Sequence, residues 1–460
     1  MSLTSQYTDL RNLAGGMSTS VRGTRFNMLL ADAFARDGVD TEADQRGPNG
    51  EVDVAFNYDG TWWLLEAKWY AQPIDVAPLR HLRDMLDQRR PGTMGILASL
   101  SGFDDSARRR SESARDVVLL DRPHLEALIS GVVSGPELIS GVNRALSVLG
   151  HPEIPLAFLL RPRRAEPQSS LALGVPDGFT AASVAAQDGV EADVIAHGQS
   201  LSGIAVGGGH LLITSPDGVM TVPGRPGRSG TKLRPRLELT GATGSPLHCG
   251  NGELLVVRGG GVLRSRADEL TVTAGGFTRA PLLFQGPDAA AWLLDLGTDE
   301  DDWTGNQAAN LVQVGRELGD EQRWPAGLPA GNCRAACWLH DRVFFVLGSG
   351  HSAVVDLDTG SSRWIRTPLG QPGGLIRLDE RRVLLVGRGD VAVQVTILDT
   401  ATEHAVPPVA VHLTGHVAGA ARLGDDLYVL AGAPVDATIR PVVARLDLQS
   451  LIRRLQAGAG

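Results

Sequence analysis

The chain has 460 residues, a hydrophobic content of 43% and a formal net charge of −9 at pH 7, values typical of a protein with two or three globular domains. The negative charge excludes a protein that coats nucleic acid through a global positive field, so any DNA contact must come from a local patch. The sequence has three cysteines, no apolar run long enough to cross a bilayer and no basic-then-apolar N-terminal signal, and we therefore expect a cytoplasmic protein.

Helical and strand patterns alternate over the first 150 residues. The first predicted helix spans residues 18–38, where apolar side chains recur with i, i+3, i+4 spacing and Gly38 can end the helix. A hairpin is predicted next. The remaining elements are a helix (75–88), a buried strand (92–101), a helix (102–114), a second strand (116–120) and two closing helices (122–130 and 137–149). This order of elements predicts an α/β domain of about 150 residues.

The hairpin has the sequence "GEVDVAFNYDGTWWLLEAKWY", residues 50–70. Its central pair, Asp59-Gly60, is a strong hairpin signal, because a type I′ turn requires a positive φ at both central residues. If these two residues form the turn, Tyr58 pairs with Thr61 and the register of both strands is fixed.

This register predicts a concentration of charge on one face of the hairpin. Asp53 falls opposite Glu66 and Glu51 falls opposite Lys68, so Asp53, Glu66 and Lys68 share a face. Two opposed carboxylates repel each other at a Cβ distance of roughly 5 Å, and a bridging cation would relieve the repulsion. The other face is predicted to enter a core, and it comprises Val52, Val54, Phe56, Trp63, Leu65 and Trp69.

Asp53 followed by Glu66-Ala67-Lys68 resembles the PD-(D/E)xK nuclease motif. The flanking segments "RGTRFNMLLADAF", "GILASLSGF" and "VVLLD" come in an order that is similar to the Mrr-like branch of restriction endonucleases, over roughly residues 20–130. The resemblance implies a restriction-endonuclease-like α/β fold and metal-dependent hydrolysis of DNA. The sequence departs from it at Asn27, where many relatives carry a glutamate. Glu51 could partly compensate for a metal ligand lost there.

Phosphodiester hydrolysis needs a hard divalent cation, and Mg²⁺ typically takes one or two protein carboxylates. Asp53 and Glu66 are the candidate ligands, with Mn²⁺ as an alternative metal. By resemblance, the backbone carbonyl of Ala67 would be a further ligand. Lys68, on the same predicted face, can orient the attacking water, offset charge on the phosphate and assist proton transfer.

Other residues could contact DNA, and the charged residues of the hairpin have a simpler interpretation than a nuclease site. Arg80, Arg108 and Arg109 lie on predicted helices and can contact DNA phosphates without reading sequence. The charged residues of the hairpin can also be the solvated face of an amphipathic hairpin. A retained but inactive nuclease fold, used as a DNA- or protein-binding scaffold, is a further alternative.

The chain after residue 170 reads as short strands between Gly-containing turns. Segments such as "DRVFFVLGSGHSAVVDLDTGSSRW" and "ERRVLLVGRGDVAVQVTILDTATEH" share one plan, and repeats of about 40–50 residues predict a β-propeller. Six units are clear, and residues 170–200 can supply a seventh blade or a closing strand. Residues 151–170 are predicted as a Pro- and Arg-rich linker. A pair of β-sandwiches is the alternative for this half.

The two halves together suggest a Mg²⁺-dependent endonuclease joined to a propeller that senses a protein, peptide or small ligand. Such an architecture fits bacterial defence against foreign DNA, by analogy alone. Because cutting both strands requires two active sites, a homodimer is consistent with this activity. An activity within the propeller, as a lyase or glycosidase, would need paired acids or histidine clusters, and the sequence shows no spacing that indicates them.

Overall fold

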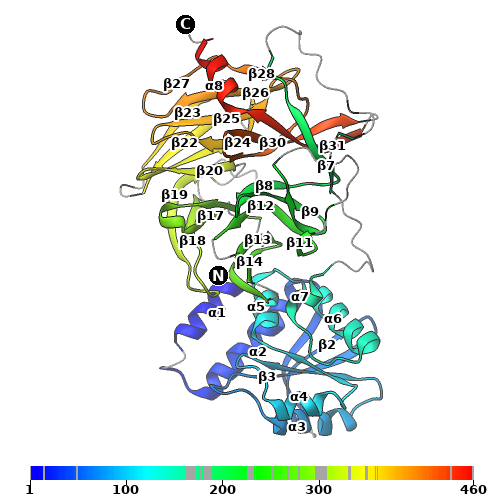
Figure 1. The fold of residues 1–460 in the computed structure, drawn as a ribbon. Coiled ribbons are helices and arrows are strands. Elements are labelled where there is room, and N and C mark those ends of the chain that lie inside the picture. Colours follow the sequence, from blue (N-terminus) through cyan, green and yellow to red (C-terminus); the bar gives the residue numbers. More distant parts are fainter. Residues whose placement is uncertain are drawn as a thin grey trace.

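The computed structural model contains an N-terminal α/β region and an all-β propeller that lie one above the other (Figure 1). The described residues are those of the full chain except 1, 14–15, 48–49, 162–170, 174, 177–178, 180–188, 225–232, 234, 250–251, 267–268, 278–279, 296–307, 330–332, 348–350, 358, 360, 436–437 and 458–460. Among the described residues, no helix is long and apolar enough to span a membrane.

The N-terminal region is built on one five-stranded sheet of order β1-β2-β3-β4-β5. The first three strands are antiparallel, whereas β3, β4 and β5 run parallel to one another. The strands are β1 (Asp40–Gly47), β2 (Gly50–Tyr58), β3 (Thr61–Lys68), β4 (Met94–Ser99) and β5 (Val117–Leu120).

Helices cover both faces of this sheet. They are α1 (Leu3–Asn12), α2 (Thr19–Arg36), α3 (Val76–Asp87), α4 (Asp105–Ser111), α5 (Arg122–Ser130) and α6 (Gly135–Arg144), which continues into a π-helical turn, η2 (Ala145–Leu149). Phe56 and Trp63 pack with α2, α5 and α6 in one hydrophobic cluster. Ala55 and Leu64 pack with α3 and α4 in another. Since both faces are buried, the hairpin has no solvated face, and that simpler interpretation was wrong.

Local signals in the sequence place the elements correctly. Helix α2 begins after Ser18, whose hydroxyl accepts a hydrogen bond from the Val21 N–H, and Gly38 takes a φ of 82° just beyond its end. Asp59 and Gly60 have φ values of 49° and 75°, as a type I′ turn requires. The prediction that Tyr58 pairs with Thr61 is confirmed.

The predicted register fails at the far end of the hairpin. The β2–β3 ladder is regular as far as Val54 and Leu65 and is not recorded beyond that pair. Val52 does not join Val54 in its cluster but packs in the cluster of α3 and α4. Glu51 pairs with Arg46 of β1 rather than with Lys68. Beyond Leu65, β3 is recorded only in its parallel pairing with β4. The residues at the open end of the hairpin therefore do not follow the alternation of faces that is predicted by counting from the turn.

The propeller has six blades among the described residues, each an antiparallel sheet of four or five strands. The pair of β-sandwiches is therefore excluded. In blade order, the strands are β8 (Gly203–Gly207), β9 (His210–Ser215), β10 (Gly218–Val222), β11 (Pro235–Glu238); β12 (Ala242–His248), β13 (Leu254–Arg258), β14 (Gly261–Arg266), β15 (Glu269–Gly275); β16 (Leu282–Gln285), β17 (Ala291–Asp295), β18 (Ala308–Gln313), β19 (Gln322–Pro329); β20 (Cys333–Leu339), β21 (Arg342–Leu347), β22 (His351–Asp356), β23 (Ser362–Arg366); β24 (Gln371–Arg377), β25 (Arg382–Arg388), β26 (Val393–Asp399), β27 (His404–Ala405), β28 (Val409–Val411); and β29 (Val417–Leu423), β30 (Asp426–Val435), β31 (Thr438–Asp447), β7 (Asp193–Gly198), β6 (Leu171–Leu173).

The sixth blade closes the ring. Strand β7 pairs with β31 and β6 pairs with β7, so strands from the beginning of the propeller complete its last sheet. Residues 170–200 therefore supply closing strands rather than a seventh blade. A C-terminal helix, α8 (Leu448–Ala457), follows β31 and packs on the same blade through Leu451 and Leu455.

The two regions share one continuous core. Leu254, Val272 and Leu318 of the propeller belong to the same hydrophobic cluster as α2 and β3. Within the predicted linker, helix α7 (Leu156–Leu159) packs so closely on α6 that a Cβ added to Gly141 would lie 2.7 Å from Leu159.

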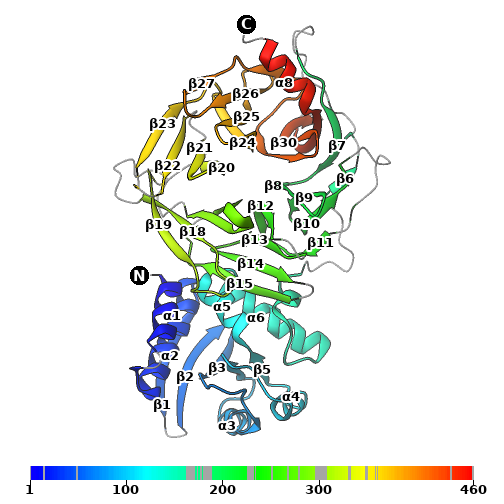
Figure 2. The same ribbon diagram turned by 60° about the vertical axis from the view of Figure 1, so that its left-hand side comes forward.

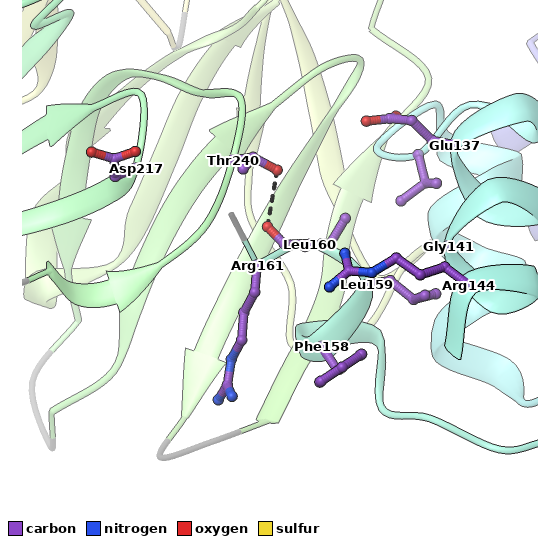
Figure 3. A pocket seen from close by; sticks show the side chains of 10 residues that line it. Glu137, Gly141, Arg144, Phe158, Leu159, Leu160, Arg161, Asp217 and Thr240 are labelled. Atoms are coloured by element: carbon purple, nitrogen blue, oxygen red, sulfur yellow. Dashed lines mark hydrogen bonds between the residues drawn. The ribbon is translucent and has the colours of Figure 1, made fainter. Parts of the chain in front are cut away.

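Polar contacts reinforce this junction. The carbonyl of Leu160 accepts hydrogen bonds from the amide (2.8 Å) and hydroxyl (2.9 Å) of Thr240. Figure 3 shows this contact beside a pocket of about 440 Å³ that α6, α7 and the first blade enclose. Residues 162–170 lie outside the described residues, and the predicted boundaries at 150 and 170 stay a prediction.

Candidate active site

The carboxylates of Asp53 and Glu66 and the ammonium of Lys68 converge where the hairpin opens. The Lys68 Nζ forms an ion pair with Glu66 Oε1 and lies 3.7 Å from Asp53 Oδ2. The side chains of Asp53, Glu66 and Lys68 are 16%, 9% and 20% exposed. The sequence thus predicts correctly that these three side chains meet, although the regular ladder does not extend to them.

Two donors outside the predicted triad hold the Asp53 carboxylate. The backbone N–H of Ala67 donates to Oδ2 at 2.7 Å, and the side-chain amide of Asn27 donates to Oδ1 at 2.9 Å. Asn27 is buried in α2, which lies against this part of the sheet. Asn27 is therefore a supporting residue through a hydrogen bond to Asp53. Glu51 is exposed on β2, and its expected compensating role beside Lys68 stays a prediction.

The protonation of the site follows from burial and mutual charge. Burial raises the pKa of Asp53 to about 6, with a further rise from the Glu66 carboxylate, and Lys68, the Ala67 N–H and Asn27 oppose the rise. Burial lowers the pKa of Lys68, but the Glu66 carboxylate outweighs this and holds it above its ordinary value. Lys68 is thus an ammonium donor at neutral pH in this arrangement and not a proton acceptor.

The residues present fit a divalent metal of the magnesium type. Two carboxylates face a common cation, the Lys68 ammonium, which shows that a positive group is stabilised between them. Within the described part of the chain, no group of three or more His, Cys, Asp or Glu side chains could hold a metal. Mg²⁺ usually takes one or two protein carboxylates and fills its octahedron with water and phosphate. Asp53, Glu66 and the carbonyl of Ala67 are the groups that could hold it.

The predicted DNA-contacting arginines lie on α3 and α4 and do not join the triad. Arg108 donates from Nε to the Phe103 carbonyl at 3.1 Å and pairs with Glu153 at 3.1 Å. It therefore helps to hold α4 to the chain that follows η2. Arg80 and Arg109 are exposed, and their contact with DNA stays a prediction.

The sequence reasoning expected Trp69 in a core but did not predict the contacts that it makes behind the site. Trp69, directly after Lys68, packs edge-on against Phe26 with 5.1 Å between ring centroids. The Arg22 guanidinium lies 5.2 Å from the Trp69 ring centroid and donates to the Trp69 carbonyl at 3.1 Å.

Helix α1 adds Tyr7 to these contacts. Its ring lies 6.3 Å from that of Trp69, and its hydroxyl donates to the buried Glu126 at 3.0 Å. Leu3, Tyr7 and Leu10 recur with the i, i+4, i+7 spacing of an amphipathic helix. This spacing, together with the Ser2 cap, is the signal that could have predicted α1.

Comparison with known proteins agrees with the N-terminal geometry. Residues 19–129 match the family model Mrr_cat, which is described as a restriction endonuclease. The match contains Asn27, Asp53, Glu66 and Lys68. The N-terminal α/β region therefore contains a domain similar to the Mrr-type restriction endonucleases, and a six-bladed β-propeller follows it.

Two solved structures show a likeness to part of this chain. One match is a structural genomics protein of unknown function from Bacteroides thetaiotaomicron, at 11% identity over 60% of this chain and 76% of that one, with a TM-score of 0.39. Another is a gluconolactonase from Xanthomonas campestris, at 16% identity over 62% of this chain and 99% of that one, with a TM-score of 0.41. A comparison with curated proteins found no match.

Proposed function

We propose that the N-terminal domain hydrolyses DNA phosphodiester bonds in a reaction that depends on a divalent metal, with Mg²⁺ the metal best suited. The observation that carries the proposal is the convergence of Asp53, Glu66 and Lys68 within the region that matches the restriction endonuclease family. The residue types support it further, because two hard oxygen ligands and one ammonium donor are what metal-assisted hydrolysis of a phosphodiester requires.

Each residue has a distinct role in this proposal. Asp53, Glu66 and the Ala67 carbonyl would hold the metal, which when bound polarises a phosphate oxygen and lowers the pKa of an attacking water. Asn27 and the Ala67 N–H keep Asp53 oriented, and both oppose the rise of its pKa.

Lys68 acts on the substrate rather than on the metal. Its ammonium is now paired with Glu66. Once the Glu66 oxygens have another cationic partner, the ammonium can turn to the attacking water and to charge that develops on the phosphate. The raised pKa of Lys68 keeps it protonated for this donor role.

We further propose that the propeller binds a protein, peptide or small ligand and that the whole protein acts against foreign DNA. Support comes from the architecture alone: a cutting domain shares its core with a six-bladed repeat that has broad surfaces for recognition. A shared core would let an event on the propeller alter the geometry of the domain beneath it.

The test is cleavage of supercoiled plasmid, methylated and unmethylated, with Mg²⁺, Mn²⁺ or EDTA. We expect cutting by wild type in either metal and none in EDTA, and loss of cutting in Asp53→Ala. Glu42→Ala is the matched control, because it removes an exposed carboxylate from the neighbouring strand β1. Equal loss in both variants, or cutting by Asp53→Ala at the wild-type rate, would contradict the proposal.

An inactive scaffold is the second candidate. Two observations favour it: an amide, Asn27, stands beside Asp53 where a third carboxylate could stand, and Lys68 already neutralises the acidic pair. It predicts that calorimetry detects no Mg²⁺ or Mn²⁺ binding and that Asp53→Ala leaves DNA binding unchanged. Metal binding that is lost in Asp53→Ala would exclude it.

A further inference from the structure

Helices α1 and α2 leave an apolar groove open on the outer edge of the N-terminal region. Figure 2 shows the two helices side by side along this edge. The groove measures about 390 Å³, and its lining comprises Gln6, Asp9, Leu10, Leu13, Arg25, Met28, Leu29 and Asp32. Leu13 and Met28 are 57% and 54% exposed, and Val21, one turn before Arg25 on α2, is 46% exposed. Large apolar side chains gathered in this way mark an interaction surface.

The charges that α2 contributes beside this groove are arranged symmetrically, and α1 adds Asp9 to the lining. Val21, Arg25, Met28 and Asp32 follow one another at intervals of four, three and four residues, so they form a single stripe along α2. Arg25 and Asp32 flank Met28 and Leu29 at equal distances, about 10 Å apart along the helix axis. Among the described residues, neither Arg25 nor Asp32 forms an ion pair or a side-chain hydrogen bond.

We propose that a second copy of this chain covers the groove, with α2 packed antiparallel on α2 of the partner subunit. A two-fold axis near Met28 brings the two Met28 side chains together. It also places Arg25 against Asp32 of the partner subunit, and Asp32 against the partner's Arg25. An isologous contact needs a patch that complements itself, and opposite charges on the two sides of an apolar centre satisfy that need. A partner of uniform charge would leave one of the two charges opposed by its own sign.

This arrangement positions the two candidate active sites about the axis. Asn27, next to Met28 in sequence, points into the domain and contacts Asp53. Each site is therefore separated from the axis by the thickness of α2, about 10 Å. The dimer proposal rests on the outer face of α1 and α2 alone and stands whether or not the site cuts DNA.

The first test is the mass of the full chain in solution, by sedimentation equilibrium or light scattering in the micromolar range. We expect about twice the monomer mass of 48.6 kDa. Met28→Glu should give monomers, because it sets two carboxylates against each other at the axis. Val148→Glu is the matched control: Val148 is 70% exposed in η2, away from the groove, and this variant should remain dimeric. Circular dichroism confirms that each variant is folded.

A charge-exchange experiment separates this geometry from any other dimer. Arg25→Glu and Asp32→Arg should each give monomers, because each single change opposes like charges across the axis. The double variant Arg25→Glu/Asp32→Arg should dimerise again. An equimolar mixture of the two single variants should form a heterodimer, because each chain then complements the other.

The outcomes decide the proposal. Monomeric single variants with recovery in the double variant and in the mixture would establish the contact. A wild-type chain that stays monomeric throughout the micromolar range would overturn it. So would a dimer that Met28→Glu and both single charge variants leave intact, which would place the interface elsewhere.

Discussion

Replacement of Asp53 by asparagine should stabilise the protein when no metal is present. Burial and the neighbouring Glu66 raise the pKa of Asp53 from an ordinary value of 3.8 to about 6. A carboxyl group whose pKa is higher in the folded state than in the unfolded state costs stability once it ionises. The cost is absent below about pH 4, grows between pH 4 and 6, and is complete above pH 6. An uncharged residue in the same place avoids it.

The magnitude follows from the same shift. A rise from 3.8 to about 6 corresponds to about 3 kcal/mol, and with its side chain 16% exposed Asp53 is buried enough for most of this to apply. The variant loses part of the attraction to Lys68, so we expect a net gain of about 1 to 3 kcal/mol at pH 8. The oxygen of the asparagine can still accept a hydrogen bond from the Ala67 N–H, and its NH₂ group can donate to the Asn27 oxygen once the Asn27 amide turns over.

Urea unfolding in EDTA, followed by the helical circular-dichroism signal, measures this gain, because most of the helices lie in the N-terminal region. The wild-type and Asp53→Asn curves should differ at pH 8 and converge as the pH falls to 4. Added Mg²⁺ should stabilise the wild type and not the variant. A variant that is no more stable than wild type at pH 8, or a gain that is the same at pH 4 and pH 8, would show that ionised Asp53 does not destabilise the fold.

Three further predictions concern residues around the site and the junction. Asn27→Ala removes a donor that lowers the pKa of Asp53, so Mg²⁺ binding, measured by calorimetry against pH, should begin at a higher pH than in wild type. Burial raises the pKa of Glu126 to about 7, so Glu126→Gln should be more stable than wild type by about 1 to 3 kcal/mol above pH 7 and equal to it below about pH 4.5 in urea unfolding. Arg258, 6% exposed, donates across the junction to Glu137 at 2.8 Å and to the buried carbonyl of Val132, and Arg258→Ala should cost about 1 to 3 kcal/mol of unfolding free energy because it leaves that carbonyl without a donor. The exposed Arg161, 3.8 Å from Glu238, is the control, and Arg161→Ala should cost less than about 1 kcal/mol.

Much of the fold was predictable because its signals are local. The Asp59-Gly60 turn fixes the hairpin, Asp75 caps α3 by accepting from the Ala77 N–H, and the strand pattern at 92–101 becomes β4. The propeller was predictable because each blade repeats one plan in sequence. The expectation that residues 170–200 can supply a closing strand describes β6 and β7, which complete the last sheet.

The remainder depended on tertiary packing that the sequence does not display. No periodicity shows that Leu318, in a propeller loop, packs in the same core as α2. Counting from the turn could not reveal that the β2–β3 ladder stops at Val54 and Leu65, because the ladder gives way to side-chain contacts of Asp53. Asn27 was identified through a family comparison as a departure, and its hydrogen bond to Asp53 became visible only once α2 was placed on the sheet.

Plasmid cleavage by Lys68→Ala beside wild type in Mg²⁺, with metal binding followed by calorimetry, tests whether these residues form a metal-dependent nuclease site. We expect that wild type cuts, that EDTA abolishes cutting, and that Lys68→Ala binds Mg²⁺ but does not cut. Cutting by Lys68→Ala at the wild-type rate would contradict this expectation. The absence of both cutting and metal binding in wild type would also contradict it.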